Sequence, residues 1–303
     1  MKDLAKGFEI TQALAAQRDG TPQRNGSLRV AVPVSVVKLL LTKSEYYMTQ
    51  RQTLASSTRI EDIVELGTAT HRLCWCAIFW IMLMYGFRAD TIGGMQSAGD
   101  LRVETDLSIK FMVRRVKRQN IASAGVLKPF VRKLPTPRTA SSLRGRIHSI
   151  IKAAAELSDS ENNPLLMSLI EKPSQASDKI TKAMQIILPP EETPDIAQGT
   201  FISSHSWRKT CASALACFCS LIQVKRWGMW KSTSSCERYI DEAFECADSF
   251  MPELFDWMHQ SSTAGTTENW NGWTGYDGIQ DEADDGVTAH EAEDSVTTSA
   301  DDA

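Results

Sequence analysis

The chain has 303 residues, of which 42% are hydrophobic and 23% charged, so one or two globular domains are expected and collagen-like or wholly disordered classes are excluded. The longest apolar run, residues 73–87, is too short to cross a bilayer, and we expect no membrane association. The N-terminus lacks the apolar segment of a secretory signal. Seven cysteines without framework spacing favour an intracellular protein, nuclear in a eukaryote and otherwise cytoplasmic.

The charge is divided unevenly along the chain. Residues 259–303 contain 11 acidic residues and no Lys or Arg, although the whole chain has a net charge of only −4. Residues 101–152, in contrast, contain 13 Lys or Arg and two acidic residues. A concentrated basic region of this kind is typical of nucleic-acid-binding proteins, although a solvated basic face has the same composition.

The first third of the chain predicts helices. Residues 1–34 are expected to form an N-terminal segment with a loop, and apolar spacing predicts a helix over 34–51. A short second helix is expected over 58–65. Residues 73–85 are apolar on every face and predict a central buried helix that ends at Gly86, since glycine readily adopts the left-handed conformation that terminates helices.

After residue 100 the spacing of the apolar residues changes from a helical to an extended pattern, which predicts strands at 101–103, 107–113 and 126–134. Helices are expected over 141–157, 165–170, 180–187, 205–218 (capped by Ser204), 221–227, 233–240 and 243–258. The fold class is therefore α+β and mainly helical, with a small antiparallel hairpin or sheet. We expect one domain over 35–258, followed by an acidic disordered tail over 259–303.

One pair of residues suggests a site for a phosphate. His205 and Arg208 are three residues apart near the start of a predicted helix, so they share a helix face close to free backbone amides. Arginine offers fork-shaped donors to two phosphate oxygens, and histidine exchanges protons near neutral pH.

The order of motifs resembles that of the tyrosine recombinases, or phage integrases, in a Cre-like or Crypton/DIRS-like branch. The matching residues cover roughly 35–250 and occur in this order: Tyr85-Gly86-Phe87-Arg88, Lys117, His205-Ser206-Trp207-Arg208, Gly228-Met229-Trp230 and Tyr239. The resemblance implies the fold of that catalytic domain, with the lysine on its β-hairpin. It also implies a site-specific recombinase that cuts and rejoins DNA, as mobile elements encode.

The resemblance assigns a role to each matching residue. Tyr239 would attack a DNA phosphodiester, and Arg88 and Arg208 would hold the phosphate oxygens. His205 would assist proton transfer at the tyrosine. In addition, Lys117 would protonate the departing 5′-oxygen, and Trp230 would donate its indole N–H. The resemblance implies no cofactor and no metal. Cys74 and Cys76, and likewise Cys217 and Cys219, lie in apolar helices and are interpreted as core residues.

Double-stranded DNA is the expected partner. Its further contacts are predicted at Arg114, Arg115, Arg118, Lys128, Arg132, Lys133, Lys209 and Lys231. The resemblance also implies a homo-oligomer on DNA, in which the apolar helix 243–258 packs into a neighbouring protomer.

The chain departs from the family in two ways. The acidic residue expected three positions after Arg88 is Thr91 here, and Asp90 stands one position early. Only some 35 residues precede the catalytic region, too few for the N-terminal clamp domain of the family. Two alternatives therefore stay open: a type IB topoisomerase-like nicking-closing enzyme, and an inactive DNA-binding relic of a recombinase.

Overall fold

In the computed structural model of the chain, the described residues are 28–94, 100–103, 108–113, 130–134, 136–157, 168–170, 173–196, 200–230, 232–241, 244–246, 248–258 and 273–274. The predicted helix at 165–170 falls mostly outside these ranges, as do residues 1–27 and nearly all of the predicted tail. The described part is mainly helical with a small antiparallel sheet, which confirms the α+β, mainly helical class.

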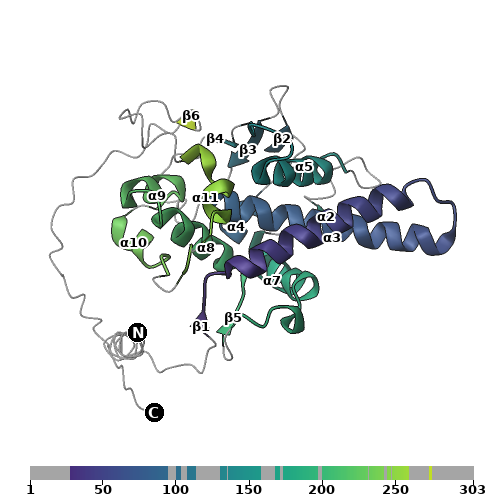
Figure 1. Cartoon of the computed structure of the whole chain (residues 1–303), viewed down its shortest axis with the longest axis horizontal. Coiled ribbons are helices and arrows are strands. Elements are labelled where there is room, and N and C mark those ends of the chain that lie inside the picture. Colours follow the sequence, from purple (N-terminus) through teal and green to yellow (C-terminus); the bar gives the residue numbers. More distant parts are fainter. Residues whose placement is uncertain are drawn as a thin grey trace, which may run out of the picture.

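Two long helices, α2 (Val34–Leu54) and α3 (Ile60–Tyr85), lie side by side as a hairpin whose closed end projects from the body (Figure 1). The prediction of two separate helices over 58–85 was wrong, because α3 continues through the polar residues between them. Those residues contain no proline, and α2 packs along α3, so the helix has no reason to break. As predicted, α3 ends at Gly86, which has a φ of 63°.

The second half of α3 forms the centre of the core. Residues 76–85 are fully buried, and the Trp80 indole donates a hydrogen bond of 3.0 Å to Ser44 Oγ on α2. The Tyr85 ring stacks on Phe87 with 4.8 Å between ring centres. Among the described residues, α3 is long and apolar enough to cross a membrane. However, 61% of its most apolar 18-residue stretch is buried inside this fold.

The larger sheet consists of β2 (Leu101–Val103), β3 (Ile109–Val113), β4 (Phe130–Leu134) and β6 (Trp273–Thr274), in that order and all antiparallel. Strand β3 alternates buried and half-buried residues, so one face lies on the core. The strand β6 comes from the segment that was predicted to be disordered. A second, two-stranded parallel sheet joins β1 (Leu28–Arg29) to β5 (Thr200–Phe201).

The remaining helices are α4 (Ala89–Ile92), α5 (Leu143–Ala155), α7 (Ala176–Ile187), α8 (Ser204–Ala216), α9 (Leu221–Trp227), α10 (Thr233–Glu237) and α11 (Phe250–Leu254). Of these, α4, α5, α7 and α8 pack on α3, whereas α9 packs on α8, α10 on α9 and α11 on α5. Helix α8 also packs on α7. Its N-cap is Ser203 rather than the predicted Ser204, in a capping box with Ser206.

The C-terminal helix is much shorter than predicted. Instead of residues 243–258, α11 spans five residues, begins after Ser249 and carries Pro252 in its first turn, and residues 256–258 are helical again after a break at Phe255. The apolar residues Met251, Leu254 and Phe255 are buried in the core of the same chain. These three side chains are therefore not exposed in the single chain, whereas Phe244, Phe250 and Trp257 of the predicted interface are half-buried.

Candidate active site

The predicted site residue Arg208 lies on α8 and is 3% exposed. Its Nη1 donates a hydrogen bond to the carbonyl oxygen of Gly86, and its Nη2 donates to the carbonyl oxygen of Gly228 at 2.6 Å. These carbonyls end α3 and α9 respectively, so one guanidinium joins three helices. The arrangement holds a positive charge in the interior with its position fixed by backbone.

Two glycines make this close approach possible. Gly86 adopts the left-handed conformation that a side chain disfavours, and a Cβ placed there would lie 3.7 Å from the Cα of Gly228. Gly228 has an ordinary φ of −81°, but a Cβ there would lie 1.6 Å from the Trp230 ring. The sequence motif Gly228-Met229-Trp230 is thus explained by a tryptophan that folds back over the glycine.

Trp230 and Tyr239 bring aromatic rings to the guanidinium. Arg208 Cζ lies 4.1 Å from the ring centre of Trp230 and 5.3 Å from that of Tyr239. The two rings are themselves 5.4 Å apart. Met229, with a φ of 55°, is the turn residue that directs Trp230 inward. The structure therefore gathers three residues that are separated by up to 31 positions in the sequence.

Arg88, another of the predicted site residues, lies between α3 and α4 and is partly exposed. The pKa of Arg208 is lowered to about 10, mainly by burial, and the positive charge of Arg88 contributes in the same direction. Arg88 also follows by two residues Gly86, whose carbonyl oxygen accepts a hydrogen bond from Arg208. Two arginine side chains in one region favour an anionic ligand.

Two N–H groups in this cluster have no acceptor among the described residues. They are Nε of Arg208 and Nε1 of Trp230, and both atoms are buried. A buried donor without a partner costs about 1–3 kcal/mol, so native proteins rarely keep one without a use for it.

The segment that carries Tyr239 is tied to α8. Ser213 Oγ accepts a hydrogen bond from the Asp241 backbone N–H at 2.8 Å and lies 3.4 Å from the carbonyl oxygen of Tyr239. Lys209 forms an ion pair of 3.1 Å with Asp241. Lys209, one of the predicted DNA contacts, therefore has an ion-pair partner within the chain. Sequence reasoning missed Ser213 and Asp241, since neither belongs to a recognisable motif.

His205 lies one turn before Arg208 on α8, as the spacing predicted. Its side chain is exposed, whereas that of Arg208 is buried, so the two residues have different surroundings. The imidazole Nδ1 lies 3.5 Å from Ser204 Oγ. The structure therefore gathers Arg208, Trp230 and Tyr239 in one cluster, whereas His205 lies on the same helix as Arg208 with an exposed side chain.

The lysine of the predicted set, Lys117, lies outside the described residues. The same holds for most of the predicted DNA contacts, namely Arg114, Arg115, Arg118, Lys128 and Lys231. Arg132 and Lys133 lie on β4, and the sheet register pairs Lys133 with Lys110 of β3.

The acidic position after Arg88 also differs from the family pattern in structure. Thr91 is buried on α4, and Asp90 precedes it with a buried Oδ1 that has no hydrogen-bond partner among the described residues. Within the same residues, no three His, Cys, Asp or Glu side chains come together as metal ligands would.

The sequence matches no protein-family model and no curated protein.

Proposed function

We propose that the chain is a DNA strand-transfer enzyme of the tyrosine recombinase type, as found in mobile elements. Its substrate is double-stranded DNA, and Tyr239 forms a covalent 3′-phosphotyrosyl intermediate. The proposal includes the finer fold assignment, a tyrosine recombinase catalytic domain.

The observation that supports the proposal best is the convergence of a phenol and an indole on a buried guanidinium. Two backbone carbonyls hold Arg208, whose Cζ lies 5.3 Å from the Tyr239 ring centre, and Arg88 follows one of them, that of Gly86, by two residues. Phosphoryl transfer is catalysed chiefly by such preorganised positive groups around the phosphate oxygens. The two buried donors without acceptors are suited to the same oxygens.

The chemical step is a transesterification. The Tyr239 oxygen attacks the phosphorus, the bond to the 5′-oxygen breaks, and the 3′ end of the cut strand remains attached to the tyrosine. The phenol proton passes to His205, and the 5′-oxygen receives a proton from Lys117, as the family resemblance implies. Rejoining reverses these transfers with another 5′-hydroxyl, so the number of phosphoester bonds is conserved.

Basic residues on the larger sheet are further candidates for contacts with DNA. The register places Lys110 of β3 opposite Lys133 of β4. Binding of lysines to the phosphate backbone releases counterions, so duplex binding should weaken steeply as salt is raised.

The test uses a nicked duplex of the cognate site, from which the leaving strand diffuses away after cleavage. The wild-type chain should form a covalent adduct, and Tyr239→Phe should form none. Tyr46→Phe is the matched control, because that ring is 57% exposed and lies outside the cluster. Adduct formation that persists in Tyr239→Phe would refute the assignment of the nucleophile.

Two further outcomes separate the alternatives. Relaxation of supercoiled plasmid without exchange between two sites would favour the topoisomerase-like activity. Salt-dependent duplex binding without any adduct would favour the inactive relic.

A further inference from the structure

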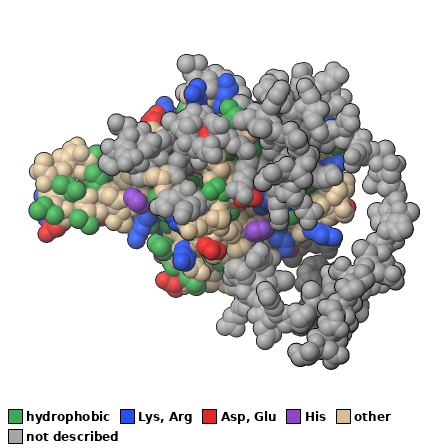
Figure 2. Space-filling model, turned by 180° about the vertical axis from the view of Figure 1, so that it is seen from behind, with side chains coloured by type: hydrophobic (Ala, Val, Ile, Leu, Met, Phe, Trp, Pro, Cys, Tyr) green, Lys and Arg blue, Asp and Glu red, His purple; other side chains and the backbone are tan. Residues whose placement is uncertain are grey.

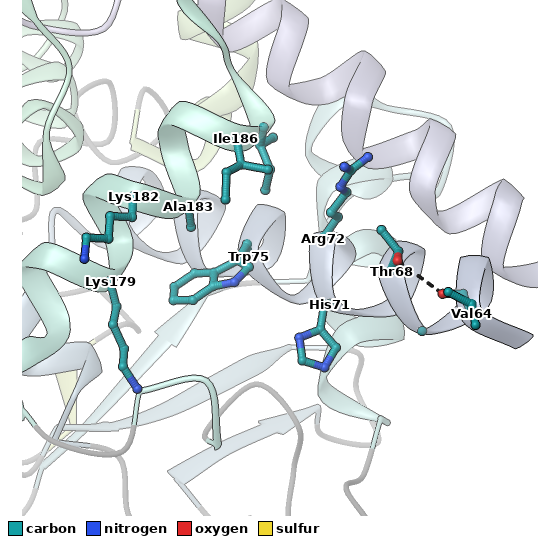
Figure 3. A pocket seen from close by; sticks show the side chains of 11 residues that line it. Val64, Thr68, His71, Arg72, Trp75, Lys179, Lys182, Ala183 and Ile186 are labelled. Carbon is teal, nitrogen blue, oxygen red and sulfur yellow. Dashed lines mark hydrogen bonds between the residues drawn. The ribbon is translucent and has the colours of Figure 1, made fainter.

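A groove on the described surface has no role in the proposed chemistry. It has a volume of about 590 Å³ and lies between the first half of α3 and helix α7 (Figure 3). Trp75, Ala183 and Ile187 line it together with the more exposed Val64 and Ile186. The two helices contribute residues at helical spacing, so the groove follows α3 and has the form that accepts another helix.

The polar part of this groove is positive. Arg72, Lys179 and Lys182 line it, and its lining residues include no Asp or Glu. Figure 3 shows Lys179 and Lys182 on α7 and Arg72 on α3, with Trp75 between them. An apolar floor between cationic side chains fits an acidic helix with one apolar face.

The same chain carries such a helix. The first turns of α3 expose Ile60 (80% exposed), Ile63 (53%) and Val64 (66%) at the free end of the hairpin. Figure 2 shows hydrophobic side chains gathered at this end. Glu61 and Glu65 lie beside them, and both are exposed. Exposed apolar residues grouped in this way are typical of interaction surfaces.

These acidic residues have only weak partners within the chain. Glu61 pairs with Arg59 at 2.7 Å, but both side chains are more than 70% exposed, so the pair contributes little. Glu65 accepts a hydrogen bond from Gln50. Both glutamates can therefore exchange these contacts for stronger ones in an interface.

Gly67 lines the basic groove on α3, directly after the acidic first turns of that helix. A Cβ at this position would meet no atom within 4 Å. Glycine inside a helix is less stable than alanine, and the space around Gly67 gives no reason for it within one chain. A second helix that crosses at this position would supply that reason, because it could approach the backbone closely.

We propose that two copies of this chain form a two-fold symmetric dimer through α3 and α7. The two α3 helices cross antiparallel near Gly67. The acidic, apolar first turns of each copy then occupy the basic groove of the other, with Val64 and Ile60 towards Trp75 and the glutamates towards the lysines. Such an interface is self-complementary, as a two-fold axis requires. It does not depend on the phosphoryl-transfer site and uses none of its residues.

The test is the mass of the full chain in solution, measured by sedimentation equilibrium. The wild type should be a dimer at micromolar concentrations. Lys179→Glu with Lys182→Glu should weaken self-association about tenfold or more, and so should Glu61→Lys with Glu65→Lys, since like charges would then face each other. A mixture of these two variants should restore a heterodimer. Lys152→Glu, which reverses a charge on α5, should leave the mass unchanged.

A second variant tests the crossing point. Gly67→Leu projects into open space in the single chain, so it should fold with an unchanged circular dichroism spectrum and yet sediment as a monomer. A wild-type chain that is monomeric throughout, or a dimer unaffected by these substitutions, would overturn the proposal. Weaker duplex binding in Lys179→Glu with Lys182→Glu, without a change in self-association, would also overturn it and assign the groove to nucleic acid.

Discussion

Replacement of Gly228 by alanine tests whether the packing around Arg208 is as tight as the structure indicates. The new Cβ would lie 1.6 Å from one carbon of the Trp230 ring and 2.2 and 2.3 Å from two others. Carbon atoms pack at about 3.5–4.0 Å, so the ring must move by about 2 Å. Trp230 is only 2% exposed, so the surrounding core must move with it.

The expected cost follows from three contributions. Overpacking of a core costs about 1–3 kcal/mol, and loss of the contact between Arg208 and the Trp230 ring costs up to about 2 kcal/mol when the pair is desolvated. The lower entropy of the unfolded alanine chain offsets about 0.4–1 kcal/mol. The backbone angles at Gly228 suit alanine, so no strain is added. We expect Gly228→Ala to lose about 2–3 kcal/mol of unfolding free energy.

Urea unfolding followed by far-UV circular dichroism measures this loss. Gly67→Ala is the matched control, measured at low protein concentration. Its Cβ meets no atom, so it should raise the unfolding free energy by about 0.5–1 kcal/mol. A Gly228→Ala chain within about 0.5 kcal/mol of wild type would refute the packing argument.

Three further predictions concern stability and positioning. Asp256→Ala leaves the buried guanidinium of Arg144 without its ion-pair partner at 2.7 Å and should cost about 3 kcal/mol in urea unfolding; an unchanged midpoint would contradict this. Burial raises the pKa of Cys74 and Cys76 to about 12, whereas both thiols ionise near 9 when unfolded. Stability is therefore retained below pH 9 and falls above it by about 1.4 kcal/mol per pH unit per thiol, and alanine at both positions should flatten this slope. Ser213→Ala removes the hydroxyl that anchors the segment after the predicted nucleophile. It should slow adduct formation about tenfold for an unfolding cost of about 1–2 kcal/mol, and an unchanged rate would argue against positioning.

Many of the helices could be predicted because they depend on the pattern of neighbouring residues in the sequence. The apolar run before Gly86 predicted a buried helix and its end, since burial on all faces and a left-handed terminator are both local signals. The extent of α3 was not predictable in the same way. Its first half is exposed on most sides, and only the packing of α2 along it explains why the helix continues to Ile60.

The C-terminal helix shows the opposite error. Six large apolar residues between 244 and 257 suggested one amphipathic helix. In the structure, Pro252 lies in the first turn of the short α11, while Asp256 pairs with the buried Arg144 of α5. A contact between two residues so far apart in the sequence follows no helical or strand periodicity, so it could not be predicted from the sequence.

For the candidate site, the spacing of motif residues predicted which residues come together, but it did not predict which of them are buried. The positions of Arg208, Trp230 and Tyr239 were predicted from motifs, and the structure brings them together. That His205 is exposed while Arg208 is buried could not be read from a separation of three residues. The carbonyl partners of Arg208 could not be predicted either, because every residue has a backbone carbonyl and the sequence does not show which ones accept a hydrogen bond.

The most direct test of the proposed function is the chemical identity of the DNA–protein link. The adduct trapped on a nicked duplex can be digested with protease and its peptide sequenced by mass spectrometry, while the released strand is assayed for its 5′ end. The proposal predicts a nucleotide joined through its 3′-phosphate to Tyr239 and a free 5′-hydroxyl on the other strand. A link to another residue, or a 5′-phosphate attached to protein, would contradict it.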